Sequence, residues 1–175
     1  MKKTFRGGKT VIRLEPIKAK NVWDVLDLKV ARKQKNFVAS NDISIIQAYT
    51  ALGTACTAFP FAICDGERPV GFLMVGYNEA AMYDSYGDVK SPEVLKNNYS
   101  LWRLMIDKKQ QKKGYGREAV RLALEFVRTF PCGKAEYCSL SYEPENKVAA
   151  KLYHSFGFEE NGETDGDEIV AVLKL

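Results

Sequence analysis

The sequence has little histidine, no paired cysteines and no long apolar run, and each absence excludes a class of protein. His154 is the only histidine, so a Cys–His or Ser–His mechanism would have to use that one ring. No stretch approaches the roughly 18 apolar residues that a membrane span needs. The four cysteines form no CxxC pair, so we expect inert thiols, a reducing compartment and no metal site.

The chain also lacks a strong excess of charge. Its net charge of +4 is too small to require a nucleic-acid partner, so the local distribution of charge matters more than the total. The length of 175 residues suits one domain, which we expect to cover residues 1–175. A basic N-terminus that no apolar run follows argues against a signal peptide, so we expect a cytoplasmic protein.

Short apolar runs and amphipathic segments alternate along the chain, which indicates a mixed α/β domain. The segment 78–98 lacks clear periodicity, and we expect it to be an irregular insertion. The predicted order is β-αα-βββ-α-β-α-ββ. Strands are expected at 11–14, 61–64, 70–77, 99–106, 134–142, from 158 and at 169–173, and helices at 22–30 (capped by Asn21), 42–53 (capped by Asp42), 116–131 and 146–156.

Residues 110–116 read QQKKGYG and lead into a predicted helix. From Asp107 to Arg117 there are five basic residues and one acidic residue. A helix N-terminus carries a partial positive charge and unpaired N–H groups, and glycines let a ligand approach the backbone closely. The stretch therefore predicts an anion site, although a solvated basic turn, with glycines that serve only the bend, is the second interpretation.

Several ligands compete for such a loop. The string GxxxxGK[ST] is absent, which excludes a P-loop. Gly114, Gly116 and Ala119 satisfy GxGxxA, but a dinucleotide fingerprint normally opens its fold, whereas about a hundred residues precede this one. A nucleic-acid-binding module could use the basic loop with Trp102 and Tyr115, yet the C-terminal part of the chain is strongly acidic. A further interpretation is a cradle for the pyrophosphate of coenzyme A, which the local basic charge favours.

Three motifs carry a resemblance to the GNAT superfamily of N-acetyltransferases. They are Leu101-Trp-Arg-Leu-Met-Ile-Asp107, then Gln111-x-x-Gly114-x-Gly116, then Asn146-x-x-Ala149-x-x-Leu152-Tyr153-x-x-x-Gly157-Phe158. The stretches 102–116, 141–146 and 36–41 more particularly resemble bacterial spermine/spermidine (diamine) acetyltransferases. The resemblance implies the acyl-CoA N-acyltransferase fold, a mixed, mostly antiparallel central sheet flanked by helices.

The resemblance also implies roles in binding acetyl-CoA. The backbone of three β-strand residues would pair with the pantetheine arm as a further strand would, and amides of the loop would hold the pyrophosphate. Asn146 would touch the cofactor, or serve only as a helix N-cap. The implied cofactor-binding residues are Leu104, Met105, Ile106, Gln111, Lys112, Lys113, Gly114, Tyr115, Gly116, Arg117 and Asn146.

Tyr153 matches the position of the general acid of the family. A phenol stays protonated at neutral pH and can give its proton to a thiolate leaving group. Tyr153 also shares a helical face with Ala149, Leu152 and Phe156, so it could instead be a core residue.

The general base is left open by the sequence. Several relatives place an acid early in the strand before the loop, where this chain has Leu101 and Trp102. His154 follows Tyr153 directly and so points about 100° away around the helix, which favours a surface position.

The acceptor is expected to be a primary amine that attacks acetyl-CoA directly in a ternary complex. The resemblance implies a polyamine such as spermidine or spermine, and another small amine or a protein N-terminus is the alternative. The segment 78–98 holds four acidic and two basic residues with Tyr83 and Tyr86, which could receive a polycation or could be a solvated loop. Glu143, Glu79 and Asp84 are the predicted substrate contacts, and the resemblance implies a homodimer.

Overall fold

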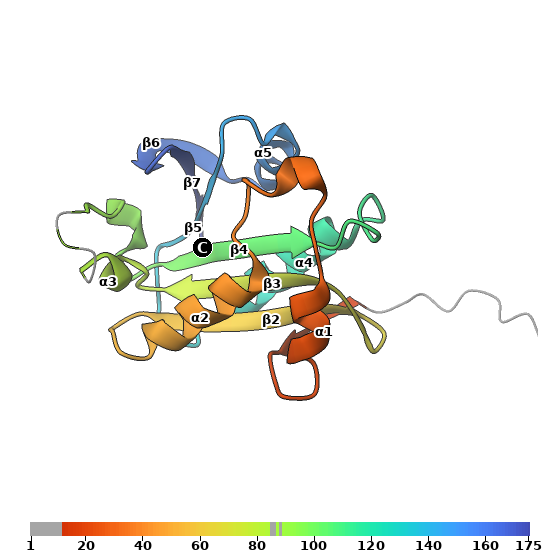
Figure 1. Ribbon diagram of the computed structural model, residues 1–175. Coiled ribbons are helices and arrows are strands. Elements are labelled where there is room, and N and C mark those ends of the chain that lie inside the picture. Colours follow the sequence, from red (N-terminus) through yellow and green to blue (C-terminus); the bar gives the residue numbers. More distant parts are fainter. Residues whose placement is uncertain (1–11, 85–86, 88) are drawn as a thin grey trace, which may run out of the picture.

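The computed structural model describes residues 12–84, 87 and 89–175, which form a seven-stranded sheet with flanking helices (Figure 1). The strand order is β1-β2-β3-β4-β5-β7-β6, and neighbours are antiparallel except for β4 and β5. The strands are β1 Ile12–Pro16, β2 Thr57–Asp65, β3 Arg68–Tyr77, β4 Tyr99–Ile106, β5 Tyr137–Tyr142, β6 Glu159–Asp165 and β7 Glu168–Lys174, and the helices are α1 Val22–Asp27, α2 Asn41–Ala51, α3 Ala80–Tyr83, α4 Tyr115–Val127 and α5 Lys147–His154. The predicted mixed, mostly antiparallel fold is confirmed.

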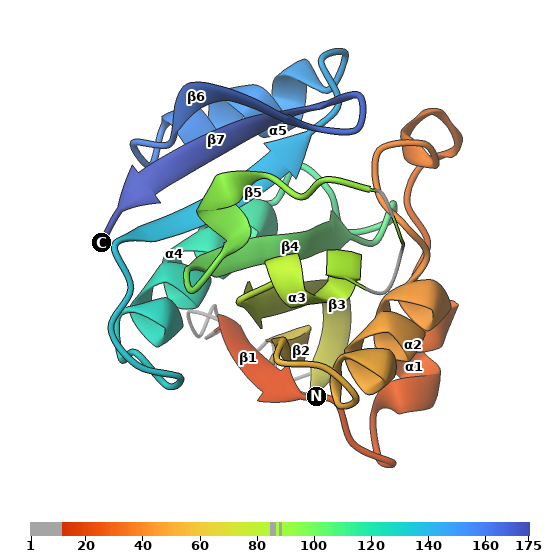
Figure 2. The same cartoon turned by 90° about the vertical axis from the view of Figure 1, so that its left-hand side faces the viewer.

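Both faces of the sheet are buried, because apolar side chains follow one another along β2 and β3. Phe61 and Ile63 belong to one core cluster, and the intervening Ala62 and Cys64 belong to another. Successive side chains of a strand point to opposite faces, so a continuous apolar run covers both. Helices α4 and α5 pack on the first face, and α1 and α2 pack on the second (Figure 2).

Three details differ from the expectation. Helix α2 has Ser40, not Asp42, at its N-cap, and Asp42 lies in the first turn. Helix α1 ends at Asp27 rather than near residue 30, because the chain turns away there and the backbone N–H of Lys29 donates to Asp107 Oδ1 at 3.0 Å. The segment 78–98 contains the short helix α3 and a 3-10 turn, Glu93–Leu95. Val11, Tyr86 and Asp88, which entered the predictions, lie outside the described residues.

Strands β4 and β5 form a fork. They are parallel and pair only through Tyr99 with Cys138 and Ser100 with Ser139. Beyond Ser100 the two strands separate, so one edge of β4 has no partner strand among the described residues. A β-bulge lies next to this point, since Val75 of β3 pairs with Leu101, Met74 pairs with Arg103, and the intervening residue of β4 is extra.

In the part of the chain that the structure describes, no helix combines the length and apolarity needed to cross a membrane. Among the same residues, no group of three or more His, Cys, Asp or Glu side chains is arranged so that it could hold a metal ion.

Candidate functional site

A cleft of about 920 Å³ opens where β4 and β5 separate. Its walls come from β4, β5, α3, α5, the loop 110–116, the segment 33–39 and the turn between β6 and β7. Charge is uneven along it, because Lys112 lies beyond the C-terminal end of β4 whereas Glu79 contacts Ser100 near the start of that strand. Figure 1 shows α3 and the loop before α4 at opposite ends of β4. The cleft therefore has a basic end and an acidic end.

The loop at the basic end has an unusual backbone. Gly114 has a φ of 85° and is the N-cap of α4, and Lys112 has a φ of 64°. Left-handed backbone is routine for glycine and uncommon for other residues, so the loop depends on Gly114 in particular. The bend brings the chain to the helix start at Tyr115, where the first N–H groups of α4 have no partner within the helix.

Side-chain contacts fix this loop at two points. Gln111 Nε2 donates to Ile106 O at 3.1 Å and to Gln34 Oε1 at 2.8 Å, which ties the loop to the end of β4 and to the segment 33–39. The Tyr115 hydroxyl donates to Asp65 Oδ2 at the end of β2. The backbone amides at the helix start are therefore held in place by the surrounding chain.

Gly116 leaves room at the start of α4. A Cβ built on it would meet Leu152 Cδ2 at 3.7 Å and Ile106 Cγ1 at 3.8 Å, which are ordinary contacts. The packing of the protein does not require glycine here, and Gly116 lines the cleft. This opening, next to unpaired helix N–H groups and a basic loop, fits a phosphate group that approaches the backbone.

The predicted basic residues of the loop lie in different places. Lys112 lines the cleft, whereas Lys113 and Arg117 do not. Lys113 Nζ donates to Gln110 Oε1 at 2.8 Å, and Arg117 Nη1 donates at 2.9 Å to Oγ of Ser155, the C-cap of α5. These two charges can therefore contribute to the field at the loop from outside the cleft.

The free edge of β4 runs along the cleft. Leu104, Met105 and Ile106, the residues predicted to pair with an extended ligand, all line it. Their other edge is paired with β3, through Leu73 opposite Leu104 and Gly71 opposite Ile106. An unpaired strand edge can take an extended chain through main-chain hydrogen bonds.

Helix α5 contributes two predicted residues to the opposite wall. Asn146 is its N-cap, and Oδ1 accepts from Ala149 N at 3.3 Å, so the cap interpretation is confirmed; Asn146 also lines the cleft. Tyr153 is 8% exposed, packs between Tyr142 and Phe158, and lines the cleft. It is both a core residue and a wall residue, so the two interpretations of its position are compatible.

The phenol of Tyr153 is a very weak acid in this setting. Burial, together with the negative charge of Glu168, raises the pKa of Tyr153 above its ordinary value. The hydroxyl therefore stays protonated across the range of pH in which proteins are usually assayed.

Glu79 is the buried carboxyl group at the acidic end. It is 5% exposed, and Ser100 Oγ donates to its Oε2 at 2.6 Å. Burial raises the pKa of Glu79 to about 7, against the lowering effects of the Ser100 hydrogen bond and of Arg103. A Cβ on Gly76 would come within 2.6 Å of Ser100 Oγ, so the glycine in β3 makes room for this pair.

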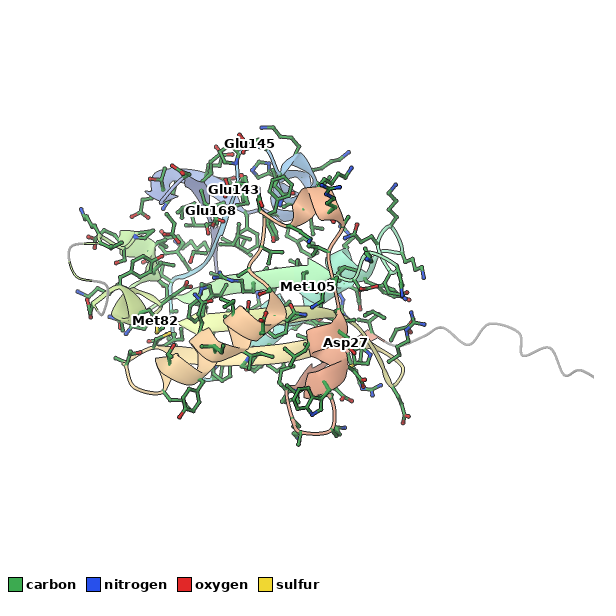
Figure 3. All side chains as sticks on the ribbon, viewed as in Figure 1. Asp27, Met82, Met105, Glu143, Glu145 and Glu168 are labelled. Carbon is green, nitrogen blue, oxygen red and sulfur yellow. The ribbon has the colours of Figure 1, made fainter. Side chains whose placement is uncertain are left out.

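Two further carboxylates reach the cleft from the β6–β7 hairpin. Tyr83 OH donates to Asp165 Oδ1 at 2.7 Å, and Ser141 Oγ donates to Glu168 Oε2. Burial raises the pKa of Glu168, and its acidic neighbours Asp165 and Glu143 add to the effect. Figure 3 shows Glu143 and Glu168 near each other, above β4 in that view.

Arg103 supplies positive charge beside these acids. Its Nη2 donates to Gln47 Oε1 at 3.1 Å and its Nη1 to Trp102 O at 2.8 Å. Nε is buried and has no hydrogen-bond partner among the described residues. Arg103 lowers the pKa values of both Glu79 and Glu168.

The structure brings most of the predicted residues to one cleft. Tyr153, Asn146, Glu143 and Glu79 line it, whereas Asp84 is exposed and does not. The sequence interpretation did not assign Ser100, Arg103, Ser141, Asp165 and Glu168 to the site. Their spacing gives no signal, because Glu79, Ser100 and Glu168 meet only through the tertiary fold.

Two known proteins are similar to this chain over most of its length. The chain is 27% identical over 168 residues to the "Probable spermine N(1)-acetyltransferase" of Bacillus subtilis subsp. natto, with 94% of this chain and 99% of that protein covered. It is 26% identical, with the same coverage, to the "Spermine/spermidine N(1)-acetyltransferase" of Bacillus subtilis.

Solved structures share the fold. An aminoglycoside acetyltransferase in complex with coenzyme A matches 94% of this chain and 95% of its own, with a TM-score of 0.70 and 15% identity. A PaiA N-acetyltransferase from Thermoplasma acidophilum in complex with coenzyme A matches 94% and 99%, with a TM-score of 0.61 and 11% identity. The sequence model of the Acetyltransferase (GNAT) family matches residues 24–158. This chain therefore belongs to the GNAT family and is an acetyl-CoA-dependent N-acetyltransferase.

Proposed function

We propose that this enzyme acetylates a primary amine of a polyamine such as spermidine or spermine, by direct attack of the amine on acetyl-CoA in a ternary complex. The observation that carries the proposal is the acidic end of the cleft, where Glu79, Asp165 and Glu168 line the same wall region as Tyr153. Asp165 and Glu168 raise the pKa of Glu79, which places the three carboxyl groups within electrostatic reach of one another. A cationic acceptor would be attracted to that end, whereas an anionic one would be repelled.

The basic end would hold the acetyl donor. The edge of β4 at 104–106 would bond to the pantetheine arm, and the amides from Lys112 to Arg117 would bond to the pyrophosphate. The open space at Gly116 and the left-handed backbone at Gly114 support this assignment. When bound, acetyl-CoA supplies the acetyl group as a thioester with a thiol leaving group.

The amine half of the site would recognise a chain with several positive charges. One nitrogen would lie at the fork, and carboxylates at Asp165, Glu168 and Glu143 would accept hydrogen bonds from the others. Tyr83 and Trp102 line the same region and could contact the alkyl stem and its charges. The two Bacillus relatives bear names that specify spermine or spermidine, which supports the same class of acceptor.

Tyr153 would act as the general acid. Its buried, protonated hydroxyl lines the cleft on the side of α5, opposite the free edge of β4. From there it could donate a proton to the sulfur that leaves the thioester.

An acceptor screen tests the substrate. The purified enzyme is given acetyl-CoA with spermidine, spermine, putrescine, lysine, kanamycin or a peptide with a free N-terminus, and release of the thiol is followed. We expect kcat/KM for spermidine or spermine to exceed that for the other amines at least tenfold. A higher kcat/KM for kanamycin, the peptide or lysine would contradict the polyamine assignment and leave the acetyltransferase itself standing.

A matched variant tests the acidic end. Glu168→Gln keeps the size of the side chain and an acceptor for Ser141, but removes one negative charge. We expect KM for spermine to rise about tenfold, and KM for acetyl-CoA to stay within about twofold. An equal rise in both constants would contradict a role confined to the amine.

The homodimer and the cytoplasmic location are further proposals from the sequence. Sedimentation velocity at two protein concentrations tests the first, where a single species of about twice the chain mass is the expected result.

A further inference from the structure

The amine needs a proton acceptor before it can attack. A primary alkylammonium has an ordinary pKa of about 10.4, so little of it is neutral at pH 7. His154 does not serve, because its side chain is half exposed, contacts Tyr142 and Glu160, and does not line the cleft. We infer that Glu79 is the general base that removes this proton. The inference rests on acetyl transfer to an amine, and it does not depend on which amine is used.

Glu79 reaches the cleft from the chain between β3 and α3, not from β4. It lines the cleft together with Ser100 and Tyr153. The Ser100 hydrogen bond takes Oε2 and sets the orientation of the carboxyl group, so Oε1 is the oxygen that can accept a proton. Ser100 is the last residue of β4 that pairs with β5, which places Glu79 at the apex of the fork.

The charges around Glu79 suit a base that works near neutral pH. Burial, with Asp165 and Glu168, raises the pKa of Glu79, Ser100 and Arg103 lower it, and the net result is a pKa of about 7. Two other titratable groups face it, since Glu79 raises the pKa values of Tyr83 and Cys56. A base whose pKa lies near the working pH combines a large ionised fraction with useful basicity.

The other carboxylates of the cleft are engaged differently. Glu168 accepts from Ser141, and Asp165 accepts from Tyr83, and both are more exposed than Glu79. Their place in the cleft suits them to contact a cationic acceptor. Glu79 is nine-tenths or more buried. Of these three carboxyl groups it is therefore the one whose charged form is most destabilised by burial, and the one that gains most from taking up a proton.

The protons balance as follows. Glu79 takes one proton from the ammonium, and the nitrogen lone pair forms the N–C bond with the thioester carbonyl. As the C–S bond breaks, Tyr153 gives its proton to the sulfur and recovers one from the second N–H of the attacking nitrogen. Glu79 then releases its proton to solvent, so one amide, one thiol and one free proton are formed.

The test combines kinetics with a titration of the free enzyme. Spermidine is the acceptor, or the best amine of the screen if spermidine is not acetylated. The acceptor screen then tests the polyamine assignment, and the kinetics of Glu79→Gln test the general base independently of it. We expect kcat/KM of the wild type to decrease at pH values below an apparent pKa near 7, which gives the pH profile an acidic limb. Glu79→Gln should lower kcat by 10²- to 10⁴-fold and remove that limb. In the free wild-type enzyme, a carboxyl ¹³C resonance should titrate near pH 7 and be absent from Glu79→Gln.

Three comparisons separate a base from a structural residue. Glu79→Gln should keep the wild-type Kd for coenzyme A. Ser100→Ala removes a hydrogen bond that favours the ionised carboxylate, so the acidic limb should move to higher pH. Glu125→Gln, an exposed carboxylate on α4 that contacts Arg121, should leave the profile unchanged. The inference is overturned if the limb survives in Glu79→Gln, or if Ser100→Ala leaves it in place.

Discussion

Ser100 Oγ donates a hydrogen bond of 2.6 Å to Glu79 Oε2 at the point where β4 parts from β5. The pair links the last hydrogen-bonded position of the fork to the most buried carboxyl group of the cleft. It also lies beside the bulge at Trp102, where β4 leaves regular register with β3. The same hydrogen bond therefore orients the Glu79 carboxyl group at the fork and lowers its pKa.

Gly76 is the residue that this contact requires. Gly76→Ala places a methyl group 2.6 Å from Ser100 Oγ, so we expect a loss of about 1–3 kcal/mol in the free energy of unfolding. Ser100→Ala removes the atom that is hit, so the double variant should recover part of the loss, measured by urea unfolding of all four proteins. Strict additivity of the two changes would contradict the clash.

The stability of the protein should depend on the ionisation of Glu79. Its folded pKa of about 7 lies above the ordinary 4.5, so the fold favours the protonated form. Wild-type stability should therefore fall as pH rises from about 4.5 through 7, by roughly 3 kcal/mol in total. Glu79→Gln is neutral throughout, so its unfolding free energy relative to wild type should increase between pH 5 and pH 8. Parallel pH curves would contradict the shift.

The two glycines of the loop should behave differently. Gly116→Ala meets only ordinary contacts, so the midpoint of thermal unfolding should not fall, while Kd for coenzyme A should rise about tenfold or more. Gly114→Ala forces alanine to a φ of 85° and should cost about 1–2 kcal/mol of stability as well as affinity. Calorimetric titration with coenzyme A measures both affinities.

Gly162 offers the matched control for backbone strain. Its φ of 84° equals that of Gly114 within a degree, and it too has open space where a Cβ would lie. Gly162→Ala should therefore destabilise the fold to a similar extent and leave Kd for coenzyme A unchanged. A loss of affinity in that variant would mean that strain alone accounts for the effect at Gly114.

Tyr153→Phe should separate chemistry from packing. The ring contacts with Tyr142 and Phe158 are kept, so the unfolding midpoint should stay within about 2 °C of wild type. Loss of the proton donor should lower kcat by about 10²- to 10⁴-fold, with an unchanged Kd for coenzyme A. Turnover at the wild-type rate would leave Tyr153 with a packing role alone.

Two substitutions at Asn146 separate its role as a helix cap from a role of its amide group in binding coenzyme A. Asn146→Asp keeps an oxygen for Ala149 N, so stability should hold, but its negative charge should raise Kd for coenzyme A about tenfold. Asn146→Ala should lose about 1 kcal/mol of stability through the missing cap. If both variants bind coenzyme A like the wild type, Asn146 is a cap and nothing more.

Local patterns predicted most of the elements. The face of α4 formed by Val120, Ala123, Leu124 and Val127 is buried as its spacing predicts, because a 3.6-residue period fixes which side chains share a side. The basic glycine loop was found in the same way, since backbone freedom at Gly114 is a local property. Asp42 shows the limit of such patterns, because several adjacent polar residues can occupy a cap position.

By itself, the sequence determined the order of strands and helices apart from α3, the basic glycine loop before α4 and the helical face that holds Tyr153, because each depends on residues close together in the chain. Only the tertiary structure decided which acids meet in the cleft. Glu79, Ser100 and Glu168 come from three separate segments, and burial by the assembled fold, rather than residue type, raises the pKa of Glu79 to about 7. Desolvation depends on everything that packs around a group, and no short stretch of sequence contains that information.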